Sequence, residues 1–326
     1  MTTDTSADTS AAAPHVPVMI AACLEGLDVR PGQWYVDGTF GAGGHSRALL
    51  AAGASVLAVD QDPNVRPFAE QLAAEQGARE RFVFVAGNFR HLDRHVEAAG
   101  LSSVAGVLLD LGVSSMQLDE AERGFAFRQE GPLDMRMGEE EIDAADVVNE
   151  YPQDELAAII YRYGEERHSR RVARRIAEAR EQERITTTEQ LADIVVSAYP
   201  PGRRREHPAR RTFQALRIYV NDELGALEDG LGAAARVLGP GGRLVVLSYH
   251  SLEDRIVKHT AKEHEGLEPV HKKPLTASDE EILQNPRARS AKLRTIRKRP
   301  PETQTEIVST ETASGTALET ELEAES

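Results

Sequence analysis

The chain has 326 residues, of which 40% are hydrophobic, and a formal net charge of −15. Its single cysteine, Cys23, excludes an intrachain disulfide framework and any zinc or iron–sulfur site built from cysteines, as is typical of the reducing cytoplasm. No apolar run approaches the ~20 residues that span a bilayer, and residues 1–13 lack the basic and apolar regions of a signal peptide. We therefore expect a cytoplasmic protein with no membrane partner.

Much of the negative charge lies in the two ends of the chain. Residues 302–326 carry seven glutamates and no lysine or arginine, and residues 1–13 carry two aspartates. Removing these nine acids from the total of −15 leaves −6. Both ends are rich in serine, threonine and alanine and lack aromatic residues, so we expect a disordered N-terminus and a disordered acidic tail.

Five short apolar runs predict the strands of a central sheet, and the stretches between the first four predict helices. Alternating strands and helices are typical of an α/β protein with a doubly wound, mostly parallel sheet. The expected strands cover 34–36, 56–59, 82–85, 104–109 and 243–248, and the expected helices include 46–52, 64–76 and 91–99.

The alternation stops after the fourth strand, and residues 144–199 have the pattern of helices only. Asp154 is expected to cap one of these helices, and a capping box from Thr186 to Glu189 is expected before another. The expected helices cover 155–163, 170–183 and 191–198, and a long helix over 212–238 leads back to the last strand.

These patterns predict a discontinuous α/β domain that is interrupted by an all-helical domain. The α/β domain is expected to comprise residues 14–118 and 207–301, and the inserted helical domain residues 119–206. An insertion at this point borders the carboxyl ends of the strands, where ligands bind in open parallel sheets. We interpret it as an RNA-recognition domain.

The glycine-rich segment after the first strand predicts a nucleotide-type cofactor site. Asp37 ends the strand, and Gly41, Gly43 and Gly44 follow before the next helix. Glycines let the backbone approach a ligand closely, and the free N–H groups at a helix start favour an anion. Asp60 ends the second strand and is placed to accept hydrogen bonds from ribose hydroxyls.

Two cofactor families use this layout, and the spacing of the glycines distinguishes them. A dinucleotide fingerprint that starts at Gly41 needs a third glycine where Ser46 stands. The pattern of S-adenosylmethionine (AdoMet) enzymes fits better, although Thr39 replaces its first glycine. The spacing therefore favours AdoMet over NAD.

Nine runs of residues are each longer than a generic fold motif. They cover 15–18, 37–47, 108–115, 121–125, 131–137, 163–167, 211–218, 248–255 and 285–294. Together they closely resemble the bacterial 16S rRNA cytosine-N4 methyltransferases, the RsmH/MraW family, and only the two termini lie outside the match. The resemblance implies a Rossmann-like class I methyltransferase domain that uses AdoMet on 16S rRNA near the decoding centre of the small ribosomal subunit. It also suggests a homodimer, and we expect no metal.

The resemblance implies a set of cofactor contacts on this chain. Asp60 would bind the ribose and Phe89 would lie beside the adenine, although Phe89 could equally be a core aromatic residue. Asp110 and Gln117 would lie near the methyl donor. With the loop residues, the expected cofactor site comprises Asp37, Gly41, Gly43, Gly44, His45, Asp60, Phe89, Asp110 and Gln117.

Asp110 ends the fourth strand, and we interpret it as an acceptor that orients the target amine, with capping of the following turn as the alternative. Many amino-methyltransferases carry Asp/Asn-Pro-Pro-Tyr here, whereas residues 110–113 read Asp-Leu-Gly-Val, so an aromatic platform for the base must come from elsewhere. Phe125, Phe127 and His250 are candidates. The catalytic candidates are Asp110, Ser114, Ser115 and His250.

Basic residues gather in two clusters, one between Arg162 and Arg211 and one between Lys272 and Arg299. Residues 170–184 also have the pattern of a solvated helix face that pairs with its own glutamates. The turn at 200–205 favours phosphate contact instead, because only Glu206 lies near its three arginines. The expected RNA-binding residues are Phe125, Arg203, Arg204, Arg205, Arg287, Arg289, Lys292 and Arg294.

Two rival functions remain open at this point. A methyltransferase acting on a small molecule or a protein would use the helical insertion as a lid, but the basic clusters argue against it. A non-catalytic nucleotide-binding module would keep Asp60 without moving a methyl group, but the intact Asp37, Gly43 and Asp110 argue against that reading.

Overall fold

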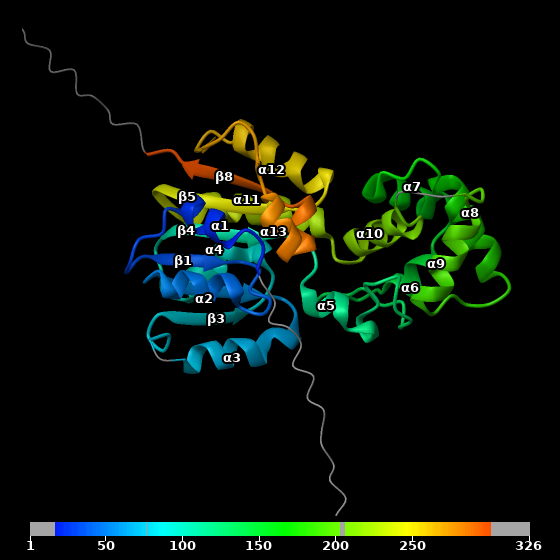
Figure 1. The fold of residues 1–326 in the computed structure, drawn as a ribbon, viewed down its shortest axis with the longest axis horizontal. Helices are drawn as coiled ribbons and strands as arrows, with labels where there is room; N and C mark the ends of the chain where they lie inside the picture. Colours follow the sequence, from blue (N-terminus) through cyan, green and yellow to red (C-terminus); the bar gives the residue numbers. More distant parts are fainter. Residues whose placement is uncertain (1–16, 76, 203–205, 301–326) are drawn as a thin grey trace, which may run out of the picture.

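The computed structural model describes residues 17–300 except 76 and 203–205, and the expectations for the two termini and for Arg203, Arg204 and Arg205 lie outside the described residues. Its sheet has the order β3-β2-β1-β4-β5-β8-β6, with the short β7 paired to β8 (Figure 1). β1 to β5 are mutually parallel, and β8 runs antiparallel to β5, β6 and β7. The strands are β1 (Trp34–Asp37), β2 (Ser55–Asp60), β3 (Phe82–Ala86), β4 (Val104–Asp110), β5 (Leu238–Ser248), β6 (Leu267–Pro269), β7 (Leu275–Thr276) and β8 (Lys292–Lys298).

Both faces of the sheet are covered, because successive residues of each strand point to opposite sides. Val245 belongs to the core under one set of helices, and its neighbours Leu244 and Val246 belong to the core under the other. Strands buried on both faces read as continuous apolar runs, which is why they were visible in the sequence. The predicted doubly wound, mostly parallel α/β fold is confirmed.

The helices around the sheet divide into two layers. One face packs against α1 (Ile20–Leu27), α2 (Gly44–Ala51) and α3 (Arg66–Ala74). The other face packs against α4 (Leu92–Ala98), α11 (Glu223–Val237) and α12 (Ser251–Glu263). None of the helices in the described part of the chain has the length and apolar character needed to cross a bilayer.

A separate group of helices lies beside the sheet (Figure 1), and together with loop residues such as Leu133, Met135 and Ile185 these helices form a hydrophobic core of their own. It is built around Leu156, Ile160, Val172 and Leu191, all of which are fully buried. Its helices are α6 (Ala144–Glu150), α7 (Gln153–Gly164), α8 (Ser169–Arg180), α9 (Thr188–Ser197) and α10 (Ala209–Val220). We call this unit the helical part; it includes α10, which lies beyond the expected 119–206, and those bounds stay a prediction.

The predicted long helix over 212–238 is wrong, because α10 and α11 are separate helices. The helical conformation is interrupted at Asn221 and Asp222, and Asp222 has a left-handed backbone with φ 45°. The Asn221 side chain accepts a hydrogen bond from Met137 N (2.7 Å) and donates one to Met135 O (2.8 Å). Its Nδ2 also donates to Arg217 O at 2.8 Å, and a side chain that binds the nearby backbone in this way competes with helix continuation.

Several local expectations also differ from the structure. Asp154 does not cap its helix, since Pro152 is the N-cap of α7 and Asp154 lies in the first turn. The capping box before α9 joins Thr187 and Gln190, one residue later than expected. The sequence patterns missed β6, β7 and β8 together with the helices α1, α5 (Ser115–Asp119), α12 and α13 (Asp279–Gln284).

Asn221→Ala should lower the free energy of unfolding by about 2–4 kcal/mol, because it leaves the amide of Met137 and the carbonyl of Met135 buried without partners. Urea denaturation would measure this loss. Asn64→Ala is the matched control: Asn64 is exposed, and its substitution should change the free energy by less than ~0.5 kcal/mol. Equal stability of the two variants would contradict this role of Asn221.

Candidate active site

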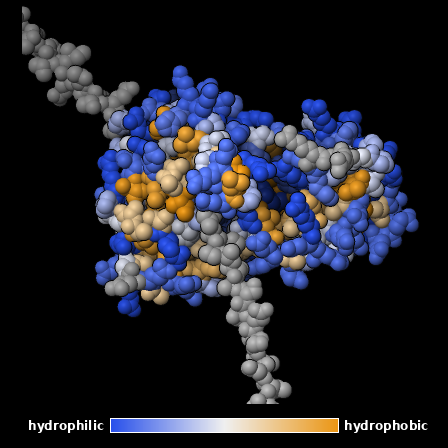
Figure 2. Space-filling model, in the orientation of Figure 1, coloured by the Kyte–Doolittle hydropathy of each residue, from blue (hydrophilic) through white to orange (hydrophobic). Residues whose placement is uncertain are grey.

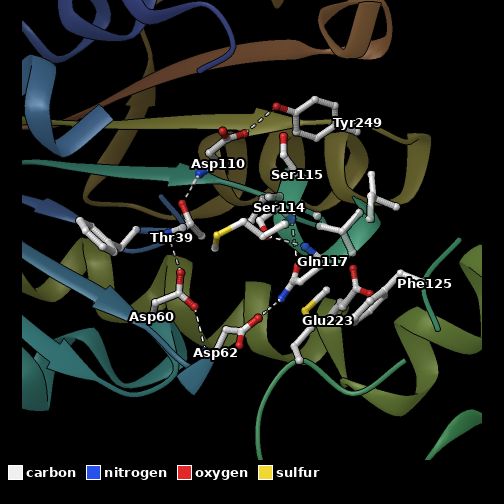
Figure 3. A pocket seen from close by; sticks show the side chains of 18 of the residues that line it. Thr39, Asp60, Asp62, Asp110, Ser114, Ser115, Gln117, Phe125, Glu223 and Tyr249 are labelled. Atoms are coloured by element: carbon white, nitrogen blue, oxygen red, sulfur yellow. Dashed lines mark hydrogen bonds between the residues drawn. The ribbon is translucent and has the colours of Figure 1, made fainter. Parts of the chain in front are cut away.

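The carboxyl ends of the parallel strands open into a cavity of about 840 Å³ that the helical part closes on one side. Figure 3 shows Asp110 and Tyr249 on one side of this cavity and Glu223 and Phe125 on the other. Of the expected site residues, those in its wall are Gly41, Gly44, His45, Asp60, Phe89, Asp110, Ser114, Ser115, Gln117, Phe125, Phe127, His250 and Arg287.

Asp37 and Gly43 stabilise the conformation of the glycine-rich loop and are not among the residues that line the cavity. Asp37 is fully buried and accepts a hydrogen bond from Ser46 Oγ at 2.7 Å, so it anchors the start of α2. Gly43 has φ 79°, and a Cβ there would lie 2.8 Å from the ring of Phe40. Both residues hold the loop in shape, and their contact with the cofactor stays a prediction.

Gly44 is required by a close approach to the N-terminal segment. A Cβ at this position would lie 2.0 Å from Cγ of Pro17. His45, the next residue, contacts the same segment, because its Nε2 lies 3.1 Å from Val18 O. The loop, the start of α2 and residues 17–18 therefore form one wall of the cavity.

Asp60 is held at the end of β2 by two backbone amides. Gly41 N donates to Oδ2 at 2.7 Å and Asp62 N donates to Oδ1 at 2.9 Å. Burial raises the pKa of Asp60 to about 6, although both amide hydrogen bonds lower it. Each carboxylate oxygen has a further lone pair, so Asp60 retains acceptor capacity toward the cavity, as ribose hydroxyls require.

Asp110 ends β4 in the cavity wall and is bound by residues that are distant in the sequence. Tyr249 Oη donates to its Oδ1 at 2.7 Å, and Thr39 Oγ1 accepts from its backbone amide at 2.7 Å (Figure 3). Its Oδ2 lies 3.8 Å from His45 Nδ1. Burial raises the pKa of Asp110, while His45 and Tyr249 lower it. Tyr249 was not expected here, and the run Ser-Tyr-His-Ser after β5 is the signal that could have indicated it.

Gln117 is part of a buried network rather than a free ligand group. Its Oε1 accepts from Ser114 N (2.9 Å) and its Nε2 donates to Asp62 Oδ2 (2.8 Å), as Figure 3 shows. Asp62 also accepts from Arg123 Nη1 at 2.8 Å. Arg123 Nη2 reaches the backbone carbonyl of Arg136 at 3.0 Å and so joins the sheet to the helical part. The sequence patterns missed Asp62 and Arg123.

Ser114 and Ser115 begin α5 directly after the Asp110 loop. Ser114 is the N-cap of this helix and accepts from Gln117 N at 3.2 Å, so its hydroxyl has a structural partner. Ser115 lies between Ser114 and Tyr249 in Figure 3 and lines the cavity. Of the two serines, Ser115 is therefore the better candidate for contact with a substrate.

The aromatic candidates differ in how much of each ring is already packed. Phe89 lines the cavity, but a Cβ on Gly230 of α11 would lie 2.6 Å from its ring, so one side is covered. Phe127 stacks on His207 with ring centroids 4.6 Å apart. Phe125 is 6% exposed and belongs to the helical core. Both of the last two rings remain in the cavity wall.

His250 and Glu253 form the capping box of α12. His250 N donates to Glu253 Oε2 at 3.2 Å, and Tyr249 N donates to the same oxygen at 2.7 Å. His250 Nδ1 accepts from Glu253 N at 3.4 Å, and its buried Nε2 lies 3.2 Å from Oε1 of Glu253. His250 therefore has a structural role in addition to lining the cavity.

A bidentate ion pair between Arg217 and Glu223 lies in the cavity wall, with Glu223 on the side opposite Asp110 (Figure 3). Arg217 Nε and Nη2 donate to the two oxygens of Glu223 at 2.7 and 2.9 Å. Glu223, His250 and Glu253 bring ligand-type atoms within 4.8 Å of one another, but Arg217 and backbone amides already bind their carboxylates. The sequence patterns missed this pair, since nothing local marks residues that meet across a break between helices.

The second basic cluster is largely paired with acids of the same chain. Arg294 is 11% exposed and binds Asp254 at 2.7 Å, and Lys292 binds the same carboxylate at 3.2 Å. These ion pairs reduce the charge that Lys292 and Arg294 can offer to a phosphate, and their role as RNA ligands stays a prediction. Arg287 contacts Asp119 at 3.3 Å but lines the cavity, and Arg289 is exposed.

In the first basic cluster, helix α8 carries both paired and unpaired arginines. Arg174 and Arg175 contact Glu178 at 3.6 and 3.0 Å, in agreement with the expected self-paired face. Arg167 and Arg170, just before and at the start of α8, are exposed and form no ion pair with a described residue. Hydrophilic residues predominate on the face of the helical part that Figure 2 shows.

Three features define the class of protein: the order of the strands in the sheet, the glycine-rich loop, and an Asp60 carboxylate that accepts hydrogen bonds from backbone amides. Together they define the chain as an AdoMet-dependent methyltransferase. A model of the MraW methylase family matches residues 12–299, and the chain belongs to this family. Similar proteins include the ribosomal RNA small subunit methyltransferases H of Deinococcus deserti (57% identical, covering 86% of this chain and 92% of the relative), Deinococcus radiodurans (55%, 86% and 88%) and Caulobacter vibrioides (50%, 87% and 95%).

The affinity for AdoMet should fall as the pH is lowered through about 6. Protonation of Asp60 removes the charged acceptor for ribose hydroxyls, and the pKa of Asp60 in the free protein is about 6. Asp60→Asn should weaken binding at pH 7.5 by about 1–3 kcal/mol and flatten this pH dependence. Calorimetric titration between pH 5 and 8 measures both effects.

The exposed Asp154→Asn serves as the control for Asp60→Asn and should behave as the unmodified protein. An Asp60→Asn variant that binds AdoMet with unchanged affinity and unchanged pH dependence would remove Asp60 from the site.

Proposed function

We propose that the protein transfers a methyl group from AdoMet to the exocyclic N4 amine of a cytidine in 16S rRNA of the small ribosomal subunit, in the cytoplasm. One observation carries this proposal: a single cavity joins the glycine loop and Asp60 to Asp110 and to a wall formed by the helical part. A cofactor and a flipped base can share such a space. The membership of the MraW methylase family and the names of its relatives support the substrate class.

AdoMet supplies the electrophilic methyl group when it is bound. The lone pair of the cytosine amine is delocalised into the ring. An acceptor that binds one N–H of this amine helps to orient the lone pair toward the methyl group. Asp110 can serve as this acceptor through Oδ2, which accepts no hydrogen bond from a described residue. Orientation supplies much of the rate in such a reaction, and a strong general base is not required.

The helical part is proposed to hold the RNA. Glu165, at the end of α7, accepts hydrogen bonds from Ser251 and Arg255 of α12, whose N-cap His250 lines the cavity. These contacts bring the turn between α7 and α8 close to the cavity entrance. Arg167 lies in this turn and Arg170 in the first turn of α8; neither forms an ion pair with a described residue, so both can contact phosphates. The homodimer suggested by the resemblance stays a prediction.

Mass mapping of small-subunit rRNA should find one N4-methylated cytidine that depends on this protein. Asp110→Asn should lower the turnover far more than the affinity for AdoMet, because the neutral amide is a weaker acceptor of similar shape. Single-turnover assays and calorimetry separate the two quantities. Methylation of a protein or a small molecule in place of rRNA would overturn the proposed substrate, and full turnover by Asp110→Asn would overturn the role of Asp110.

Replacing both Arg167 and Arg170 by alanine should weaken RNA binding and leave AdoMet binding unchanged. If both side chains contact phosphates, the slope of log K against log salt should become shallower by roughly 1.5. Filter binding of small-subunit RNA fragments across a salt series measures this slope.

The matched control removes Arg174 and Arg175 from the same helix, since both are already paired with Glu178. Its salt dependence should stay closer to that of the unmodified protein. Identical slopes for the two double variants would show that the turn between α7 and α8 does not contact the RNA backbone.

A further inference from the structure

The hydroxyl of Tyr249 is placed to control the carboxylate of Asp110. Its Oη lies 2.7 Å from Asp110 Oδ1, across 139 residues of sequence. The backbone of Tyr249 is fixed because its amide donates to Glu253 Oε2 at 2.7 Å. Its ring lies close to the loop after β4, since a Cβ on Gly112 would come within 3.7 Å of it. The phenol therefore approaches Asp110 from a rigid support.

The second oxygen of Asp110 faces His45, whose proton position follows from its other contact. His45 Nε2 lies 3.1 Å from the Val18 carbonyl, which can only accept, so Nε2 carries the hydrogen. In the neutral ring Nδ1 then has no hydrogen to donate to Asp110 Oδ2, 3.8 Å away. The two oxygens of Asp110 are therefore inequivalent: Oδ1 is occupied and Oδ2 is available.

We propose that Tyr249 is a positioning residue for methyl transfer: its hydroxyl occupies Asp110 Oδ1, stabilises the carboxylate and leaves Oδ2 to accept the N–H of the target amine. This inference rests on the proposed function. It assigns Tyr249 a role through Asp110 and no contact of its own with the reacting atoms. Without the phenol, the carboxyl group would lose its short hydrogen bond from Tyr249, the one side-chain hydrogen bond that a described residue donates to it, and the restraint on its rotation.

The charge state of Asp110 gives a signature of this role. The ionisable groups that face it are His45 of α2, Asp37 of β1, Glu253 of α12, Cys23 of α1 and Tyr249 itself. Burial raises the pKa of Asp110, as do the charges of Asp37 and Glu253, whereas the hydrogen bond from Tyr249 lowers it and His45 lowers it when its ring is protonated. Loss of the Tyr249 hydroxyl should therefore raise the pKa of Asp110, which a role in packing alone would not do.

The test compares Tyr249→Phe with the unmodified full-length protein. The variant should lose roughly tenfold or more in kcat and keep its affinity for AdoMet, because a hydrogen bond to a charged group is removed. The acid limb of its pH–rate profile should move to higher pH. Tyr219→Phe is the matched control, since it removes a phenol that bonds to Tyr151 Oη (3.2 Å) outside the cavity, and its profile should stay unchanged.

Two further measurements keep the inference independent of the assay. In protein with ¹³C-labelled aspartate carboxyls, the NMR titration of Asp110 should shift to higher pH in Tyr249→Phe. In the Asp110→Asn background, adding Tyr249→Phe should cost much less than it does alone, because the two residues act as one unit. Additive losses, or an unmoved Asp110 titration, would overturn the inference.

The outcomes also separate this inference from the proposed function. An unmodified protein that methylates no cytidine would refute the function, while the NMR titration would still decide whether Tyr249 stabilises the Asp110 carboxylate. An active unmodified protein with equal kcat and an equal acid limb in Tyr249→Phe would refute the role of Tyr249 alone.

Discussion

Burial of carboxylates at the ends of parallel strands is the constraint on which the rest of the site depends. A carboxylate removed from water is costly unless hydrogen bonds replace the lost hydration. Here the replacing donors come from the segments that follow β1 and β5: Ser46 for the first acid, the amide of Gly41 for the second and Tyr249 for the third. The hydrogen bonds that stabilise these buried carboxylates therefore also determine the shape of the cavity wall. The acids are Asp37, Asp60 and Asp110, at the ends of β1, β2 and β4.

The junction between the sheet and the helical part uses the same physics. Asp62 is 3% exposed and binds Arg123, whose guanidinium continues to backbone carbonyls of the helical part. Asn221 ties the break between α10 and α11 to residues 135–137. Two buried polar links with defined geometry thus hold a second hydrophobic core against the cavity, where apolar contact alone would allow sliding.

The distribution of charge shows why counting basic residues along a sequence is a weak guide to RNA contacts. Lys292 and Arg294 share the carboxylate of Asp254, and such pairs do not offer their full charge to a phosphate. Arg167 and Arg170 follow Glu165 and Glu166 in the sequence but form no such ion pair with a described residue. Whether a basic residue remains available to bind a phosphate therefore depends on whether an acid of the same chain already pairs with it.

The sequence by itself determined the five parallel strands, the glycine-rich turn and the acids Asp60 and Asp110, because apolar periodicity, glycine and strand ends are local signals. Only the tertiary structure decided the insertion of β8 between β5 and β6, the break at Asn221 and the bond between Tyr249 and Asp110. These features join groups far apart in the chain. Their energy comes from strand pairing and from partners for buried polar atoms, neither of which leaves a periodic pattern in the residues involved.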